Sequence, residues 1–249
     1  KHVMQKDPIS VHVDTPLDEV AQIIEKYDLV AIPVLDSIGR LVGQITVDDV
    51  MDEVREQSER DYQLASGLSQ DVETDDNVFR QTTARLPWLI IGMLGGIGNS
   101  MILGNFDATF AAHPEMALYI PLIGGTGGNV GTQSSALIVQ GLANSSLDSK
   151  NTLKQVAKEA VVALINATII SLLVYTYNFI RFGAMATVTY SVSISLFAVV
   201  MFASIFGTLV PMTLERLKID PAIATGPFIA ITNDIIGMML YMGITVLLS

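Results

Sequence analysis

Long apolar stretches in the second two-thirds of the chain constrain its fold more than any other feature. Each is long enough to cross about 30 Å of hydrocarbon as a helix. They lie at residues 86–106, within 116–147, at 160–180, within 182–214 and at 221–249. The sequence therefore predicts a membrane domain over residues 86–249, built as a bundle of five transmembrane helices in a lipid bilayer.

Charge separates this region from the rest of the chain. Residues 1–85 hold 18 acids and 8 bases, whereas residues 86–249 hold 7 acids and 6 bases. An acidic, charge-rich segment is typical of a soluble module, so the chain is predicted to be multi-domain, and no nucleic-acid partner is expected. The sequence contains no cysteine, which excludes disulfides, thiolate zinc sites and cysteine nucleophiles.

Asp234 is the only charged residue between residues 222 and 248, inside the last apolar stretch. An aspartate at the centre of a spanning helix costs about 2.5–3.5 kcal/mol, and such residues are usually functional. Ala230 and Gly237 share a helical face with it and leave backbone oxygens accessible. Pro227, one turn further back, is expected to free a carbonyl from its usual partner. A carboxylate among carbonyl oxygens suits a hard cation.

The second apolar stretch contains five glycines within residues 124–131, preceded by Pro121. Glycines let helices approach closely or open the backbone onto a cavity, and together with Pro121 they are expected to break this helix. Polar side chains follow in the same stretch, at Asn129, Thr132, Gln133 and Ser134. Tight helix packing alone is one interpretation. The lone carboxylate on another span favours a cavity.

Basic residues between the apolar stretches are biased to one side of the membrane. Seven flank the predicted loops on that side, namely Arg80, Arg85, Lys150, Lys154, Lys158, Arg216 and Lys218, and the opposite side has only Arg181. Because Lys and Arg accumulate in cytoplasmic loops, the acidic module is predicted to be cytoplasmic. Five spans would then leave the C-terminus outside.

The N-terminal residues predict a small α/β unit. Asp14 and Thr15 are candidate caps for a helix with Pro16 in its first turn. Apolar runs at residues 29–35 and 41–46 predict two strands, joined by an Asp-Ser-Ile-Gly turn. A second, acidic helix is expected to follow.

This order resembles a CBS domain, with Ile-Pro-Val-Leu-Asp at residues 32–36 and Gly-Arg-Leu-Val-Gly-Gln-Ile-Thr-Val-Asp-Asp at residues 39–49. The resemblance implies a CBS unit over residues 1–57, expected to be the second of a pair whose partner is missing. In that family the positions of Thr46 and Asp49 often contact the ribose of a bound nucleotide such as ATP. A structural module that dimerises without a nucleotide is the alternative.

Acidic residues crowd the helix after the second strand. Asp49, Asp52 and Glu56 are spaced three and four apart and share a face, and Asp48 and Asp61 lie nearby. Like charges at this spacing repel by a few tenths of a kcal/mol per pair, which a divalent cation would relieve. An ordinary solvated acidic face is the alternative.

Residues 58–85 are predicted to form a connecting (plug) helix between the soluble and membrane domains. Within them, Thr-Asp-Asp-Asn at residues 74–77 is a plausible helix cap.

The membrane half carries a second resemblance. Its signatures are Gly-Thr-Gly-Gly-Asn-x-Gly-x-Gln-Ser at residues 125–134, Asp-Pro-Ala at 220–222, and Asn-Asp-x-x-Gly at 233–237. They resemble those of the MgtE family of magnesium channels, which also share the order of CBS unit, acidic connecting helix and five spans. The resemblance implies a homodimer in the bacterial inner membrane, with spans two and five of both subunits lining one pore.

The resemblance also implies roles for single residues. Asp234 matches the pore aspartate that holds hydrated Mg²⁺, and Ala230 and Gly237 match positions whose carbonyls face the ion's water shell. The pore-lining positions of span two correspond to Gly125, Gly128, Asn129 and Thr132, the last standing where some members have Asn. The regulatory Mg²⁺ site corresponds to Asp49, Asp52 and Asp61, within the cluster that also holds Asp48 and Glu56.

The predicted function is therefore a Mg²⁺-selective channel, gated by cytosolic Mg²⁺, rather than an enzyme. Two-fold symmetry would place two Asp234 carboxylates around one divalent ion. The alternatives are a transporter or exchanger for Mn²⁺ or Co²⁺ and a non-conducting Mg²⁺ sensor. A membrane enzyme with a CBS regulatory module is disfavoured, because Asp234 has no second titratable group within its span.

Overall fold

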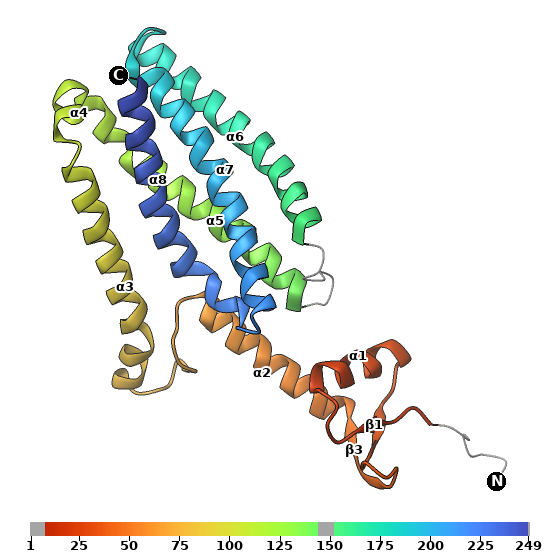
Figure 1. Ribbon diagram of the computed structural model, residues 1–249. Coiled ribbons are helices and arrows are strands. Elements are labelled where there is room, and N and C mark those ends of the chain that lie inside the picture. Colours follow the sequence, from red (N-terminus) through yellow and green to blue (C-terminus); the bar gives the residue numbers. More distant parts are fainter. Residues whose placement is uncertain (1–7, 144–151, 249) are drawn as a thin grey trace. The chain divides into compact units, whose positions relative to one another are not determined.

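The computed structural model describes residues 8–143 and 152–248. The chain divides into two compact units, Lys1–Tyr62 and Gln63–Ser249, and each is considered by itself (Figure 1). Lys150, one of the basic residues behind the predicted orientation, lies outside the described residues.

The first unit is a small sheet with helices. Its elements are β1 (Val11–His12), α1 (Leu17–Tyr27), β2 (Ala31–Leu35), β3 (Leu41–Thr46) and the start of α2 (Val47–Ala65). The strand order is β1-β2-β3, with β2 parallel to β1 and antiparallel to β3. Its core consists of Val11, Val20, Ile24, Ile32 and Val50, all buried. The predicted small α/β unit at the N-terminus is confirmed.

The start of α1 differs from the prediction. Pro16 occupies the N-cap position, and no side chain caps this helix. The Thr15 hydroxyl instead accepts a hydrogen bond from the His12 N–H at 3.0 Å. A cap by Asp14 or Thr15 is therefore wrong, because Thr15 lies one residue too early and closes the preceding turn.

The turn between β2 and β3 follows the prediction. Asp36 Oδ1 accepts hydrogen bonds from the backbone N–H groups of Ile38 and Arg40, at 3.0 and 2.8 Å. Gly39 has a φ of 78°, a left-handed conformation that favours glycine. The short side chain of Asp36 and the freedom of Gly39 together set the hairpin.

The second unit is helical. Its elements are α3 (Val78–Gly104), α4 (Asp107–Ala112), η1 (Pro114–Tyr119), α5 (Ile120–Ala143), α6 (Thr152–Phe182), α7 (Thr187–Arg216), η3 (Pro221–Ala224) and α8 (Gly226–Leu248). Among the described residues, four segments are long and apolar enough to cross a membrane: α3, α6, α7 and Pro221–Leu248. The predicted count of five is not confirmed by this criterion. α5 has 24 residues, but its glycines and polar side chains lower its hydropathy.

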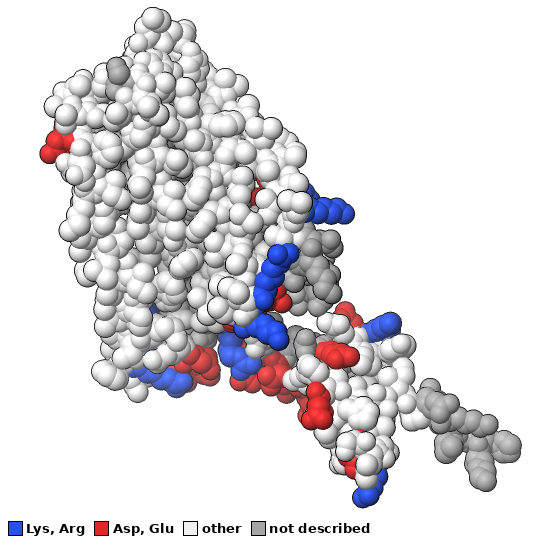
Figure 2. All heavy atoms as spheres, viewed as in Figure 1, with Lys and Arg blue, Asp and Glu red and all other residues white. Residues whose placement is uncertain are grey.

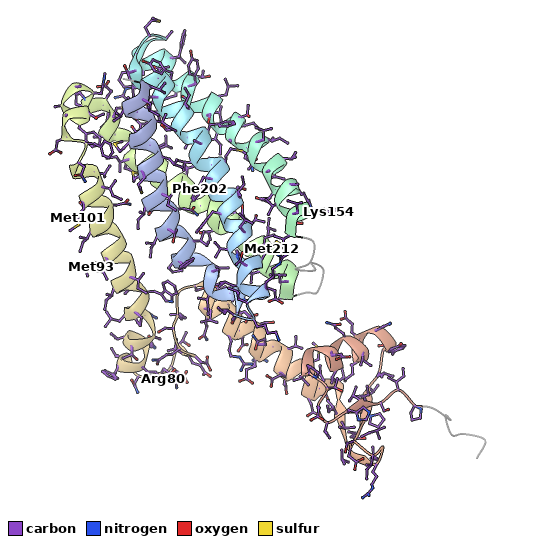
Figure 3. The ribbon with its side chains drawn as sticks, viewed as in Figure 1. Arg80, Met93, Met101, Lys154, Phe202 and Met212 are labelled. Carbon is purple, nitrogen blue, oxygen red and sulfur yellow. The ribbon has the colours of Figure 1, made fainter. Side chains whose placement is uncertain are left out.

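α7 is the centre of the helical unit. It packs against α5, α6 and α8, while α3 packs mainly against α8 (Figure 1). The core between these helices is apolar, with Tyr241, Met116, Leu196 and Met242 among its fully buried side chains. Met93 and Met101 of α3 point away from the other helices (Figure 3). Charged side chains are sparse over most of the visible face of the helices (Figure 2), as expected of a surface that meets lipid.

Two prolines lie at helix starts. Pro121 is the second residue of α5, and the glycine run after it stays helical. A proline in the first turn is tolerated because its missing N–H has no partner within the helix. The predicted break in this span is therefore wrong. Pro227 is likewise the second residue of α8, so it frees no carbonyl inside that helix, contrary to the prediction.

Residues 58–85 are not one continuous helix. α2 ends at Ala65, and α3 begins at Val78. Asn77 caps α3, since its Oδ1 accepts a hydrogen bond from the Arg80 N–H at 2.9 Å, as the sequence predicts.

The backbones of α5 and α7 touch each other where Gly131 faces Gly207. A Cβ on Gly207 would stand 3.1 Å from Ser134 Cβ and would overlap the carbonyl oxygen of Gly131. Helices approach this closely only where the facing residues lack bulky side chains. The glycines of α5 therefore serve packing in the described structure.

The close contact at Gly207 predicts that alanine substitutions at two glycines change the stability of the protein by different amounts. Gly207→Ala should lower the free energy of unfolding by about 1–3 kcal/mol, because the added methyl group overpacks the α5–α7 contact. Gly96→Ala is the matched control, since no atom lies within 4 Å of the position of its Cβ. Thermal unfolding of the purified protein in detergent measures both. Equal melting temperatures for the two variants would contradict the close approach.

Candidate functional site

Asp234 lies on α8 where that helix crosses α5. A Cβ on Gly124 would stand 3.2 Å from Asp234 Oδ1, and one on Gly128 would stand 3.6 Å from the same oxygen. A side chain at Gly124 would therefore crowd the carboxylate, and the Cβ of one at Gly128 would touch it. The glycines of α5 make the space that Asp234 occupies.

The Asp234 carboxylate is partly buried and lacks a protein partner. Among the described side chains and backbone groups, no donor or basic group makes a hydrogen bond or ion pair with it. The helix around it is apolar, so the described part of the chain does not compensate this charge. A cation is the ligand that such a carboxylate suits best.

Ala230 and Gly237 have different nearest neighbours along α8. Ala230 faces α5, because its Cα lies 3.7 Å from the position of a Cβ on Gly128. Gly237 is buried, and the nearest atom to its missing Cβ is Val199 Cγ1 of α7, at 3.4 Å. The structure thus brings Ala230, Gly128 and Asp234 together. A Cβ placed on Gly237 would point toward Val199 of α7.

α5 presents a second, open face beside this contact. Gly125 and Asn129 are exposed and Thr132 is partly exposed, and their spacing of four and three residues puts them on one face. No atom lies within 4 Å of a Cβ placed on Gly125. The pore-lining residues predicted on α5 therefore divide between a packed side, with Gly128, and an open side, with Gly125, Asn129 and Thr132.

Asn233, next to Asp234, is buried, and neither polar atom of its side chain has a partner. Its Nδ2 is the atom nearest to the missing Cβ of Gly131, where α8 and α5 touch. A buried unpaired amide lowers the stability of the fold by about 1–3 kcal/mol. The chain therefore carries a destabilising side chain directly beside the Asp234 carboxylate. In the sequence, Asn233 stands out only as part of the Asn-Asp-x-x-Gly motif at residues 233–237.

Thr46 and Asp49 bind each other at the start of α2. Asp49 Oδ2 accepts from the Thr46 hydroxyl at 2.6 Å and from the Thr46 N–H at 3.0 Å. The side-chain bond, followed by the backbone bond, lowers the pKa of Asp49 below its usual value. Both groups are accessible, and a nucleotide contact at these residues stays a prediction.

The predicted regulatory acids do not assemble into a metal site within the described part of one chain. There, no group of three or more His, Cys, Asp or Glu side chains is placed to hold an ion. Glu56 pairs with Arg60 at 3.0 Å, and Asp61 accepts from Gln57 at 2.7 Å. Asp48 and Asp52 are exposed. The regulatory site also stays a prediction.

A second carboxylate in the helices was not singled out from the sequence. Glu159 of α6 accepts hydrogen bonds from the hydroxyls of Ser134 on α5, at 2.7 Å, and Ser204 on α7. Its signal in the sequence is its place directly before the apolar stretch at residues 160–180. The bonds to Ser134 and Ser204 could not be read from the sequence, because they join three separate helices.

Comparison with known proteins gives two family matches. The model of the MgtE family, described as a divalent cation transporter, matches residues 120–244, and the CBS domain model matches residues 1–56. The chain is 34% identical to a magnesium transporter MgtE of Bacillus subtilis over 91% of its own length. It is 33% identical to one of Thermus thermophilus over 99%, and 30% identical to one of Enterococcus faecalis over 97%. The matches cover 50%, 55% and 53% of these relatives, so the chain spans about half their length.

The open face of α5 predicts the reactivity of introduced thiols, since the chain contains no cysteine. If this face lines a water-filled path, Asn129→Cys in a bilayer should react with a charged, membrane-impermeant thiol reagent. Leu172→Cys, exposed on apolar α6, should not react, because thiolates do not form in lipid. Labelling followed by mass spectrometry measures both. A Leu172→Cys variant that reacts while Asn129→Cys stays unlabelled would refute a water-lined α5 face.

Proposed function

The chain belongs to the MgtE family of divalent cation transporters, and from this membership we propose that it forms a dimeric Mg²⁺ pore with Asp234 as its ion site. The three curated relatives are named magnesium transporters, which supports Mg²⁺ as the ion. The several apolar helices make the chain a multi-pass membrane protein. The proposed membrane is the bacterial inner membrane.

The observation that carries this proposal is the unpartnered Asp234 carboxylate against the glycines of α5. Mg²⁺ holds its water shell firmly and prefers octahedral geometry, so a site for it can be wide. Gly124 and Gly128 keep that space free of side chains. In a two-fold dimer, two Asp234 carboxylates would bring a charge of −2 to one hydrated divalent ion.

We assign α5 as the fifth spanning helix. Its 24 residues extend about 36 Å at 1.5 Å per residue, enough to cross the hydrocarbon. Its polar open face would be shielded from lipid by the second subunit and by the water of the pore. With five spans, the bias of the loop bases supports a cytoplasmic CBS unit and a C-terminus outside.

The proposed domains are a CBS unit over residues 1–57, a connecting segment over 58–85 and the membrane domain over 86–249. The end of α2 contacts the start of α8 within the second unit. A Cβ on Gly226 would overlap the Ala65 carbonyl, and one on Gly67 would stand 3.4 Å from Pro227 Cδ. A shift of the α2 end would therefore reach α8, eight residues before Asp234.

This contact supports gating by cytosolic Mg²⁺. The proposed sensor acids all lie on α2, the helix that ends at Ala65; they are Asp48, Asp49, Asp52, Glu56 and Asp61. Mg²⁺ between the acids of two subunits would remove their repulsion and shift the dimer toward a closed state. Low Mg²⁺ would restore the repulsion and release α8.

The ion site is tested by Mg²⁺ uptake into liposomes. Asp234→Asn keeps the size of the side chain but removes its charge, and it should reduce uptake to the level of protein-free liposomes. Asp107→Asn, at an exposed acid of α4, should conduct like the wild type. Uptake by Asp234→Asn equal to that of the wild type would refute the assignment. Competition by Mn²⁺ and Co²⁺ in the same assay separates a Mg²⁺ pore from a general divalent transporter.

The sensor is tested by joint replacement of Asp49, Asp52 and Asp61 with Ala. Millimolar Mg²⁺ on the cytoplasmic side should close the wild-type pore in single-channel recordings. It should leave the triple variant open, because the carboxylates through which Mg²⁺ would bridge the two subunits are gone. Glu25→Ala, at an acid of α1 outside the cluster, is the control and should still close. Closure of the triple variant at the wild-type Mg²⁺ concentration would show that these acids are not the sensor.

A further inference from the structure

A polar cavity of about 430 Å³ lies between α5, α6 and α7. Six polar side chains among those that line it are Gln133, Ser134, Lys158, Glu159, Asn166 and Ser204. No residue of α8 is among its lining residues, so the cavity is separate from the Asp234 site. Ionisable residues among spanning helices are costly and usually bind or carry an ion.

Three oxygen atoms from three helices meet in this cavity. Ser134 Oγ lies 2.7 Å from Glu159 Oε1, Ser204 Oγ contacts the same Glu159 oxygen, and the two hydroxyl oxygens are 3.0 Å apart. Each serine has one proton to donate, and an ionised carboxylate has none. Two protons cannot serve three oxygen–oxygen contacts. One pair of oxygens is therefore left in contact without a proton between them, an arrangement that a positive charge would stabilise.

The serines contribute because they are held in place. Ser134 and Ser204 are 5% and 2% exposed, so both hydroxyls are held among packed helices. Once each has donated its proton to Glu159, the remaining lone pairs of both oxygens are free to accept a cation. The amide oxygens of Gln133 and Asn166 line the same space and add further oxygen ligands, the type that hard cations prefer.

The charge of the lining favours a monovalent ion. Among the described residues that line the cavity, Glu159 is the only acid and Lys158 the only base. Lys158 is exposed and makes no ion pair with Glu159 among the described residues. Lys154, one turn earlier on α6, points away from the helices (Figure 3). One carboxylate matches one positive charge, and a divalent ion would leave an excess charge among apolar helices.

We propose that Glu159, Ser134 and Ser204 bind one small monovalent metal cation, with Na⁺ as the probe, in the cavity between α5, α6 and α7. The bound ion ties α5 to the two helices behind it. Occupancy of this site therefore fixes the position of the helix that also packs against Asp234. The proposal goes beyond Mg²⁺ conduction and does not depend on it.

The test measures equilibrium binding of radioactive ²²Na⁺ to the purified, reconstituted chain without any Mg²⁺ gradient. The wild type should show saturable binding of one Na⁺ per chain. Glu159→Gln should abolish it, and Ser204→Ala should weaken the affinity by about 10-fold. Lys158→Gln, the matched control on the neighbouring residue, removes a charge without removing an oxygen ligand and should bind Na⁺ at least as tightly. Asp234→Asn should retain binding.

The variants are compared only after they are shown to fold, and each binding result then supports or overturns the proposed cation site. Size-exclusion profiles of the variants establish that they fold, and Ser204→Ala gives an independent reading if Glu159→Gln does not. Absence of saturable ²²Na⁺ binding by the wild type would overturn the proposal. So would full binding by Glu159→Gln, or binding lost in Asp234→Asn but kept in Glu159→Gln. Failure of Mg²⁺ uptake with intact ²²Na⁺ binding would count against the proposed pore alone.

Discussion

The close approach of α5 to its neighbours is the contact on which the helical unit depends. Gly131 meets Gly207 of α7 on one side and the side chain of Asn233 of α8 on the other. Three and seven residues earlier, Gly128 and Gly124 face Asp234 of α8. Helices in lipid gain little from burying apolar surface and associate through such close packing. The geometry that holds the bundle together therefore also sets the position of the carboxylate.

Two carboxylates in one bundle are treated in opposite ways. Glu159 receives two buried hydroxyls and shares its cavity with Lys158. Asp234 receives no partner from the described residues, and glycines rather than donors surround it. Glu159 lies among hydroxyl donors, whereas Asp234 lies among glycines. This difference in environment fits the two separate roles proposed for these carboxylates.

Much of this could be predicted from the sequence, because the decisive signals are local. Asp234 is conspicuous as one charge in an apolar stretch, and the hairpin at Asp36 follows from the residues of its turn. The predictions that were wrong concerned where a residue lies relative to the start of a helix. Pro121 and Pro227 were expected to disturb helices, but each stands in a first turn, where proline is tolerated. Where a helix begins depends on tertiary packing, which a pattern of residue types does not contain. The Glu159 cluster was missed for the same reason, since its members are 25 and 45 residues from the acid.

The junction at Gly226 brings the end of α2 against the start of α8. Gly226 has a φ of 50° and lies against the Ala65 carbonyl, so backbone meets backbone there. A side chain at this position would be strained by its conformation and would overlap Ala65 as well. Contacts between backbones do not absorb displacement by changing rotamers, as long side chains do. The end of α2 and the start of α8 therefore meet without a side chain that could adjust between them. The glycine that begins α8 and the glycines of α5 have the same effect, because each keeps side chains out of a contact between helices.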